Sequence, residues 1–132
     1  MASLIQGIHH AAIKYDGLAK FQAALHFYHD LLGLRVARTW GEGDASAAML
    51  DTGSGILEIF ANGEGLENGK IAHIALATRD VDKCVQLVRQ AGYPVTIEPK
   101  DVVIGSQPSF PARIAFCLGA GGEVVEFFCE KE

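Results

Sequence analysis

The fold is decided by the stretch Lys70-Ile71-Ala72-His73-Ile74-Ala75-Leu76-Ala77-Thr78-Arg79-Asp80. Residues 71–77 predict a buried strand, because only His73 interrupts their apolar run. The same pattern occurs near the N-terminus in Ile8-His9-His10-Ala11-Ala12-Ile13. When Ile8 is aligned with Ile71, His10 falls opposite His73. The chain therefore uses a similar strand twice.

A second pair of strands repeats in the same way. Ile56-Leu57-Glu58-Ile59-Phe60 matches Val124-Val125-Glu126-Phe127-Phe128, with a glutamate at the centre of each. Self-similarity on this scale indicates one structural unit that is repeated. We therefore expect an α+β fold made of two βαβββ modules, which together form a curved, cup-like mixed sheet.

The predicted modules fit within one domain that covers residues 1–132. The first module spans 4–62, a polar and glycine-rich linker spans 62–70, and the second module spans 70–130. An apolar stripe predicts the helix of the first module, with its members three and four residues apart: Leu18, Phe21, Leu25, Tyr28 and Leu32. In the second module Asp80 is placed to cap the helix. Residues 95–97 predict a short strand, and residues 100–111, with two prolines, predict a loop.

Composition and net charge argue against several classes of function. The chain has 132 residues and a net charge of -5, which argues against nucleic acid, since phosphate binding requires a basic face. No apolar run is long enough for a membrane span. The N-terminal residues lead into the first strand without the length of a signal peptide. Its three cysteines lack metal-ligand spacing and predict reduced, mostly buried thiols. We expect a cytoplasmic protein with a small-molecule substrate.

Each predicted module has one histidine and one glutamate inside otherwise apolar strands. Side chains alternate along a strand, so these residues share a face with apolar neighbours. A buried carboxylate is costly unless a positive charge compensates it. A divalent cation held by His10, Glu58, His73 and Glu126 would provide that charge. Nitrogen and oxygen ligands suit nickel, cobalt, zinc, iron or manganese better than calcium.

A single strand histidine or glutamate is more often structural or solvent-facing, so only the repetition favours a metal site. His9 competes with His10 for the role of ligand. However, His9 aligns with Ala72 and faces the other side of the strand. We interpret His9 as structural.

These residues, the paired modules and the segment Phe27-Tyr28…Leu32-Gly33-Leu34 resemble the vicinal oxygen chelate superfamily, which includes glyoxalases, bleomycin resistance proteins and dioxygenases. The His-Glu-His-Glu order is most similar to glyoxalase I, the lactoylglutathione lyase. The resemblance implies a glyoxalase-like fold with one divalent metal per site, and nickel or cobalt is favoured over zinc in short chains. It also implies a homodimer whose sites are shared between chains. The residues themselves leave two arrangements open, because the paired modules can come from one chain or from two partner chains.

The resemblance further implies a lyase or isomerase reaction. A hemithioacetal of methylglyoxal and a thiol would become a thioester through an enediolate. Glu126 would move the proton, and Glu58 would be its counterpart across the metal. Asn62 stands where glyoxalase I has an asparagine near the glutathione carboxylate, and Lys14 stands where the family usually has arginine.

Two other functions remain open from the sequence. The first is a related enzyme such as methylmalonyl-CoA epimerase, which also removes a proton beside a carbonyl but typically has glutamine at the position of Glu58. The second is a resistance protein that binds an antibiotic without metal or catalysis. Metal content after purification would separate these two functions.

Overall fold

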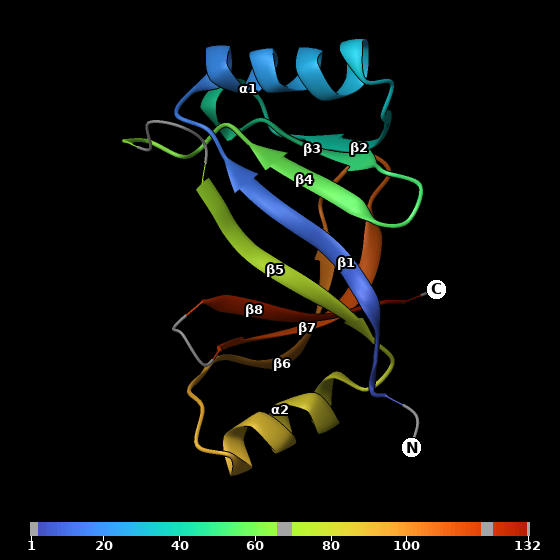
Figure 1. Ribbon diagram of the computed structural model, residues 1–132, viewed down its shortest axis with the longest axis vertical. Helices are drawn as coiled ribbons and strands as arrows, with labels where there is room; N and C mark the ends of the chain where they lie inside the picture. The colour runs from blue at the N-terminus through green and yellow to red at the C-terminus, as the bar shows by residue number, and fades with distance from the viewer. Residues whose placement is uncertain (1–2, 66–69, 120–122, 132) are drawn as a thin grey trace. The chain divides into compact units, whose positions relative to one another are not determined.

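The computed structural model describes residues 3–65, 70–119 and 123–131 (Figure 1). The elements follow in this order: β1 (Ile5–Lys14), α1 (Leu18–Leu25), a π-helical turn (His26–Leu31), β2 (Arg35–Trp40), a 3-10 turn (Gly43–Ala45), β3 (Ala47–Asp51), β4 (Ile56–Phe60), β5 (Lys70–Thr78), α2 (Val81–Gln90), β6 (Val95–Ile104), β7 (Phe110–Leu118) and β8 (Val124–Glu130). The predicted α+β class with two βαβββ modules is confirmed. Residues 66–69 of the expected linker lie outside the described residues.

Contacts divide the chain into two compact units, which are described separately. The N-terminal unit contains His10–Ala72 and Gly105–Ser109. The C-terminal unit contains Met1–His9, His73–Ile104 and Phe110–Glu132. The first two boundaries along the chain fall directly before a predicted ligand, His10 or His73. β1 and β5 each supply residues to both units.

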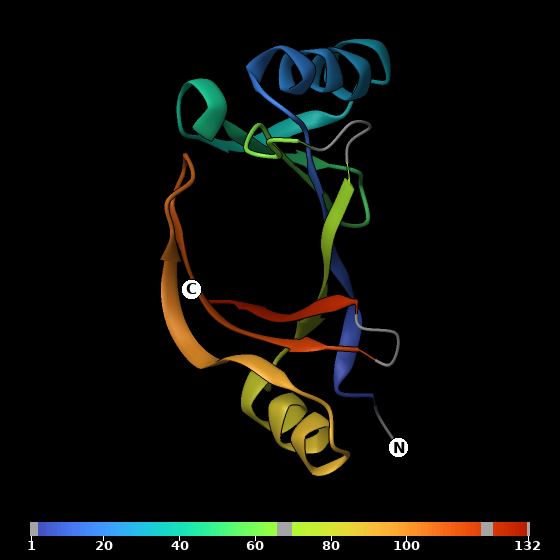
Figure 2. The same ribbon diagram turned by 90° about the vertical axis from the view of Figure 1, so that its left-hand side faces the viewer.

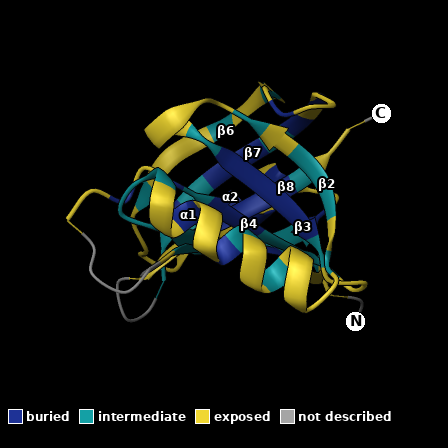
Figure 3. Ribbon diagram, turned by 90° about the horizontal axis from the view of Figure 1, so that it is seen from above, coloured by how far each residue is buried: buried dark blue, intermediate teal, exposed yellow. Residues whose placement is uncertain are grey.

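The N-terminal unit has the strand order β2-β3-β4-β1, with a parallel β1/β4 pair and antiparallel pairs elsewhere. α1 packs on one face of this sheet, and Figure 3 shows buried strand residues beneath its exposed outer surface. The buried contact set is Phe21, Ala24, Ala48, Leu50, Ile59 and Ala61. Because side chains alternate, Met49 and Glu58 belong to the opposite face.

The C-terminal unit repeats this plan with the order β6-β7-β8-β5. β5 and β8 are parallel, and the β6/β7 and β7/β8 pairs are antiparallel. Figure 2 shows α2 lying against this sheet. The buried contact set is Val81, Cys84, Val85, Ala115, Cys117 and Phe127. Glu126 therefore lies on the face that α2 does not cover.

Each unit has a register shift near the start of the strand that follows its helix. In β2, Val36 pairs with Leu50 but Arg38 pairs with Met49, so Ala37 is the extra residue. In β6, Val95 pairs with Cys117 but Ile97 pairs with Phe116, so Thr96 is the extra residue. Such a β-bulge turns the following side chains to the other face of the sheet.

The local expectations from the sequence have mixed outcomes. Asp80 caps α2 as predicted, since its Oδ1 accepts a hydrogen bond from the Lys83 amide at 3.0 Å. The loop predicted for 100–111 is wrong for residues 100–104 and 110–111, because β6 continues to Ile104 and pairs in a hairpin with β7, which begins at Phe110. Pro99 lies in the irregular part of β6, between Ile97 and Lys100. Proline is tolerated at such irregular or edge positions, so it did not end the strand.

The three cysteines are free in this structure, with Cys84 and Cys117 buried and Cys129 partly buried, as expected. Among the described residues, no helix combines the length and apolar character that crossing a membrane requires.

Candidate functional site

The N-terminal unit brings His10 and Glu58 together. Ala12 of β1 lies directly opposite Glu58 of β4, and His10 is two residues before Ala12 on the same face. His10 Nε2 is 3.5 Å from Glu58 Oε1. Both side chains are buried, since the residues are only 1% and 6% exposed. The repeated sequence pattern thus corresponds to a close histidine–carboxylate pair.

The C-terminal unit brings His73 and Glu126 together in the same way. Ala75 of β5 lies opposite Glu126 of β8, and His73 is two residues before Ala75. His73 Nε2 is 3.1 Å from Glu126 Oε1, and Glu126 is 5% exposed. The Phe116 ring meets the His73 ring edge-on, with centroids 5.5 Å apart. Phe116 therefore packs against the imidazole next to its contact with Glu126.

Both pairs have donor chemistry that suits a divalent transition metal. Each places one imidazole nitrogen and one carboxylate oxygen close together in a dry part of its unit. A buried carboxylate loses its hydration and needs compensating charge. Imidazole and carboxylate are common ligands of nickel, cobalt, zinc, iron and manganese. The residues present in each unit therefore fit half of a four-ligand site.

The register shows which residues flank each glutamate. In the N-terminal unit, one row across the sheet runs Arg38–Met49–Glu58–Ala12. In the C-terminal unit, the equivalent row runs Ile97–Phe116–Glu126–Ala75. Directly opposed residues share a face, so each whole row lies on the face of its glutamate. The rows match at the glutamate and the alanine but differ at the outer strand.

Lys14, expected to bind substrate, lies on the Glu58 face of the N-terminal unit. It is paired with Phe60, two residues after Glu58 on β4. Phe60 in turn contacts Trp40, with ring centroids 5.9 Å apart. The face therefore combines a half-buried lysine with aromatic surface next to the histidine–carboxylate pair.

Asn62, the other expected substrate residue, has different surroundings. It lines a pocket of about 330 Å³ together with Asp16, Asp44 and Glu64. Asp16 and Asn62 also form an isolated β-bridge. An anionic glutathione carboxylate bound in this pocket would meet the like charge of three carboxylates. These surroundings disfavour the role that the resemblance implied for Asn62.

His9 has its own carboxylate partner in the C-terminal unit. Its Nε2 lies 2.7 Å from Glu130 Oε2, and its ring is 4.1 Å from the Phe128 ring. Phe128 and Glu130 are on the face of Glu126, two and four residues further along β8. The sequence offered no reason to connect His9 with Glu130, because 121 positions separate them.

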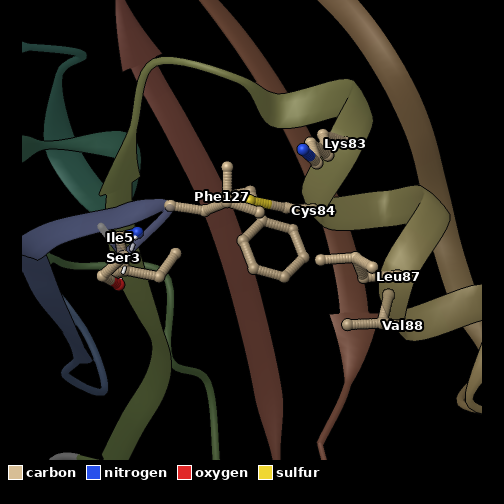
Figure 4. Close-up of a pocket in the computed structure, with 8 residues that line it drawn as sticks. Ser3, Ile5, Lys83, Cys84, Leu87, Val88 and Phe127 are labelled. Atoms are coloured by element: carbon tan, nitrogen blue, oxygen red, sulfur yellow. Dashed lines mark hydrogen bonds between the residues drawn. The ribbon is translucent and has the colours of Figure 1, made fainter. Parts of the chain in front are cut away.

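A cavity of about 750 Å³ lies on the α2 side of the C-terminal unit (Figure 4). The Phe127 ring reaches from β8 towards Leu87 and Val88 of α2. The lining residues are Ser3, Leu4, Ile5, Lys83, Cys84, Leu87, Val88 and Phe127. Because Phe127 and Glu126 point to opposite faces of β8, this cavity is separate from the histidine–carboxylate pair. Burial raises the pKa of the Cys84 thiol, which keeps it protonated and unreactive.

Arg38 is the residue of the Glu58 face that the sequence analysis missed. The repeat alignment covered only the first and last strands of each module. Extending it to the bulged strands would have set Arg38 against Ile97. The contrast between a cation and an aliphatic residue at equivalent positions was the available indication that the two units differ on this face.

The family profile described as Glyoxalase/Bleomycin resistance protein/Dioxygenase superfamily matches residues 7–127. Comparison with curated protein sequences gives no match. Several solved structures are similar over nearly their whole lengths. Methylmalonyl-CoA epimerase from Mycobacterium tuberculosis has a TM-score of 0.77 at 19% identity, covering 100% of this chain and 93% of its own.

A Streptomyces coelicolor methylmalonyl-CoA epimerase variant in complex with 2-nitronate-propionyl-CoA has a TM-score of 0.72 at 22% identity, with 97% and 99% coverage. A methylmalonyl-CoA epimerase in complex with methylmalonyl-CoA and NH4+ has a TM-score of 0.71 at 24% identity, with 96% and 95% coverage. At these identities the likeness establishes the glyoxalase-like fold.

Proposed function

The chain belongs to the glyoxalase/bleomycin resistance protein/dioxygenase superfamily, and on this basis we propose that it is a metal-dependent isomerase that epimerises an acyl-CoA thioester. The observation that carries the proposal is a close histidine–carboxylate contact in each unit, with the glutamate buried in both. Its fold neighbours include epimerases with acyl-CoA ligands, which favours this reaction over that of glyoxalase I.

His10, Glu58, His73 and Glu126 would hold the divalent ion, with nickel or cobalt favoured and zinc possible as the metal. A bound ion of this kind supplies Lewis-acid stabilisation for a developing enolate oxygen. Glu126 would take the proton from the carbon beside the thioester carbonyl, as a general base within a dry face. The configuration inverts when the resulting planar carbon receives a proton from solvent on the face opposite Glu126. Glu58 would serve as the corresponding ligand from the other module.

The glyoxalase I reaction is the second candidate. One observation favours it: the N-terminal pair contains glutamate at position 58, where methylmalonyl-CoA epimerases typically have glutamine. Two features count against it. Lys14 cannot bind a carboxylate bidentately as arginine does. The pocket around Asn62 is acidic, which would repel the carboxylates of glutathione.

A substrate panel tests the proposal directly. The protein would be stripped of metal, reloaded with nickel, cobalt or zinc, and incubated with methylmalonyl-CoA in D2O. The expected result is incorporation of deuterium at the C2 carbon, which mass spectrometry would detect. In parallel, methylglyoxal with glutathione and other thiols would be tested for thioester formation. Thioester formation without C2 exchange would support the glyoxalase I reaction and contradict the epimerase reaction. Ligand binding with neither reaction and no retained metal would favour a sequestering protein.

The homodimer expected from the sequence is kept as part of the proposal. Ile8 and Ile71, which are equivalent in the repeat, are 60% and 65% exposed. Sedimentation velocity would show whether the protein is a dimer in solution. The variants His10→Ala and His73→Ala would be unfolded, mixed and refolded to test whether sites are shared between chains. If they are shared, a mixed dimer has both changes in one site and an intact second site, so activity returns. If each site lies within one chain, every site stays damaged and the mixture remains inactive.

A further inference from the structure

We infer that the cavity between α2 and β8 of the C-terminal unit binds a medium-chain fatty carboxylate, with the alkyl chain over Phe127 and the head group at Lys83. Because the cavity is on the opposite face of β8 from Glu126, ligand binding there is independent of the proposed reaction. Three observations support this site: the size of the cavity, the apolar character of its lining and the single cation among the lining residues.

Three segments of the C-terminal unit line this cavity of about 750 Å³ (Figure 4). Residues 3–5 form one side, and α2 forms the other. The Phe127 ring of β8 lies between them. Small-molecule sites are concave cavities of roughly 300–1,000 Å³ that are lined mainly by apolar side chains. The volume and the lining of this cavity both match that description.

Leu87 gives α2 apolar surface that the sheet does not cover. Counted from the first helical residue, Leu87 of α2 is equivalent to Ala24 of α1. Ala24 is buried in the cluster between α1 and its sheet, whereas Leu87 lines the cavity and is 48% exposed. Packing of the core therefore does not account for this leucine. An alkyl chain in the cavity would remove its apolar surface from water.

Polar groups that line or adjoin the cavity have hydrogen-bond partners within the unit. The Cys84 thiol donates to Thr78 Oγ1 at 3.5 Å, and the Thr78 hydroxyl donates to the Leu4 carbonyl at 2.8 Å. Ser3 Oγ accepts a hydrogen bond from the Ile5 amide at 3.0 Å. A ligand in this cavity thus meets a mainly apolar surface. Such a surface favours an alkyl chain over a sugar or a nucleotide, whose polar groups would lose hydrogen bonds to water.

Lys83 is the only charged residue among the described residues that line the cavity. Its side chain is exposed, and its ammonium group forms no ion pair with the described part of the chain. The acidic residues nearest in sequence have other partners, since Asp80 accepts from the Lys83 backbone amide and Asp82 pairs with Arg113. Salt screens the more distant charges of the acidic chain beyond about 10 Å. A ligand with one anionic head and one apolar chain matches this distribution of charge.

A series of fatty carboxylates of increasing length tests the apolar part of the site. Hexanoate, octanoate and decanoate, each below its aggregation concentration, would be titrated calorimetrically into the full chain. Each added CH2 should tighten binding by up to about 4-fold until the chain fills the cavity. Amide chemical shifts of isotope-labelled protein would locate the ligand, and the shifted residues should include Cys84, Leu87 and Phe127. Affinity that is independent of chain length, or shifts confined to other residues, would overturn the inference.

The head group is tested with decan-1-ol and decanoate, which have chains of equal length but differ in charge. We expect decanoate to bind more tightly, and Lys83→Met to reduce that preference by about 2- to 5-fold, as for loss of one exposed ion pair. Lys20→Met is the matched control, because Lys20 has the same position in α1 and should leave the preference unchanged. Equal binding of the two ligands, or a preference that Lys83→Met does not change, would overturn the inference.

Leu87→Trp tests the cavity itself, because the larger side chain would occupy the space that the alkyl chain requires. It should weaken decanoate binding by about 10-fold or more, since the chain loses apolar contact. Leu31→Trp is the control: Leu31 is 64% exposed and is not a lining residue, so decanoate binding should be unchanged. Undiminished binding by Leu87→Trp would overturn the inference. If the protein is a dimer that Leu87→Trp dissociates, as measured by sedimentation, a second chain covers the cavity and the inference is also overturned.

Discussion

The two units share a backbone plan but present different chemistry on the face of their glutamates. Both have a parallel strand pair with a close histidine–glutamate contact and a bulged outer strand. The N-terminal face has Arg38 and Met49 where the C-terminal face has Ile97 and Phe116. Repetition therefore preserves the candidate metal ligands, while substitution at the outer strands allows each unit a separate role.

The helices also differ in how their first turns are satisfied. α2 is capped locally by Asp80. α1 begins after Gly17, which has no side chain, and its Leu18 amide instead donates to Asp44 Oδ1 at 3.0 Å. Asp44 comes from the 3-10 turn, 26 residues further along the chain. A first-turn amide thus donates to a side chain close in sequence in α2 and to a side chain distant in sequence in α1.

The largest expected effect distinguishes the two glutamates. Glu126→Gln should lower C2 proton exchange by about 10²- to 10⁴-fold, because it removes the proposed base. Glu58→Gln should lower it much less, since a glutamine oxygen can remain a metal ligand. Exchange rates and metal content would be measured for both variants. Equal large losses would contradict the division of roles between the two glutamates.

The next prediction tests whether the units unfold together. Ile59→Ala, in the fully buried cluster under α1, should reduce the free energy of unfolding by about 2–5 kcal/mol. The single tryptophan, Trp40, reports on the N-terminal unit, and buried Cys84 reports on the C-terminal unit. We expect Trp40 fluorescence and Cys84 labelling to shift together, because β1 and β5 each contribute to both units. A shift in Trp40 fluorescence alone would show independent unfolding.

A smaller effect is expected at the helix N-termini. Asp80→Ala and Asp44→Ala should each cost about 0.5–2 kcal/mol, the usual range for loss of a capping side chain. Chemical denaturation provides the measurement, with Asp30→Ala as a control that removes only exposed pairings with His26 and His29. A negligible effect of Asp44→Ala would mean that water replaces the distant cap.

The smallest effect concerns acid stability of the C-terminal unit. The Arg113 guanidinium hydrogen-bonds Asp82 and lowers the pKa of that carboxyl below its usual 3.8. The lowered pKa gives stability that is present above pH 3.8 and is lost as pH falls through the folded value. Arg113→Met should therefore move the acid-unfolding midpoint to slightly higher pH. Salt screens exposed pairs, so the shift should shrink at high ionic strength; a salt-independent shift would contradict this origin.

Several features could be predicted because they depend on neighbours in the sequence. Strand alternation and the repeat correctly placed His10 with Glu58 and His73 with Glu126 within their units. Asp80 could be identified as a cap because its hydrogen-bonding partner is three residues away. The β6 extension was missed, because prolines were interpreted as loop residues without knowledge of the hairpin partner β7. Capping by Asp44 was missed for the same reason, since its partner is distant in sequence.

The sequence by itself determined the repeated module, the strand faces and the histidine–glutamate series, because these follow from periodicity along a single segment. Only the tertiary structure decided what lies beside them. The bulges at Ala37 and Thr96 exist only in register with a second strand, and they place Arg38 in the row of Glu58 and Ile97 in the row of Glu126. The surroundings of Asn62 and the partner of His9 were likewise decided by folding. Cross-strand pairing joins residues that are far apart in the sequence, so no local pattern can encode it.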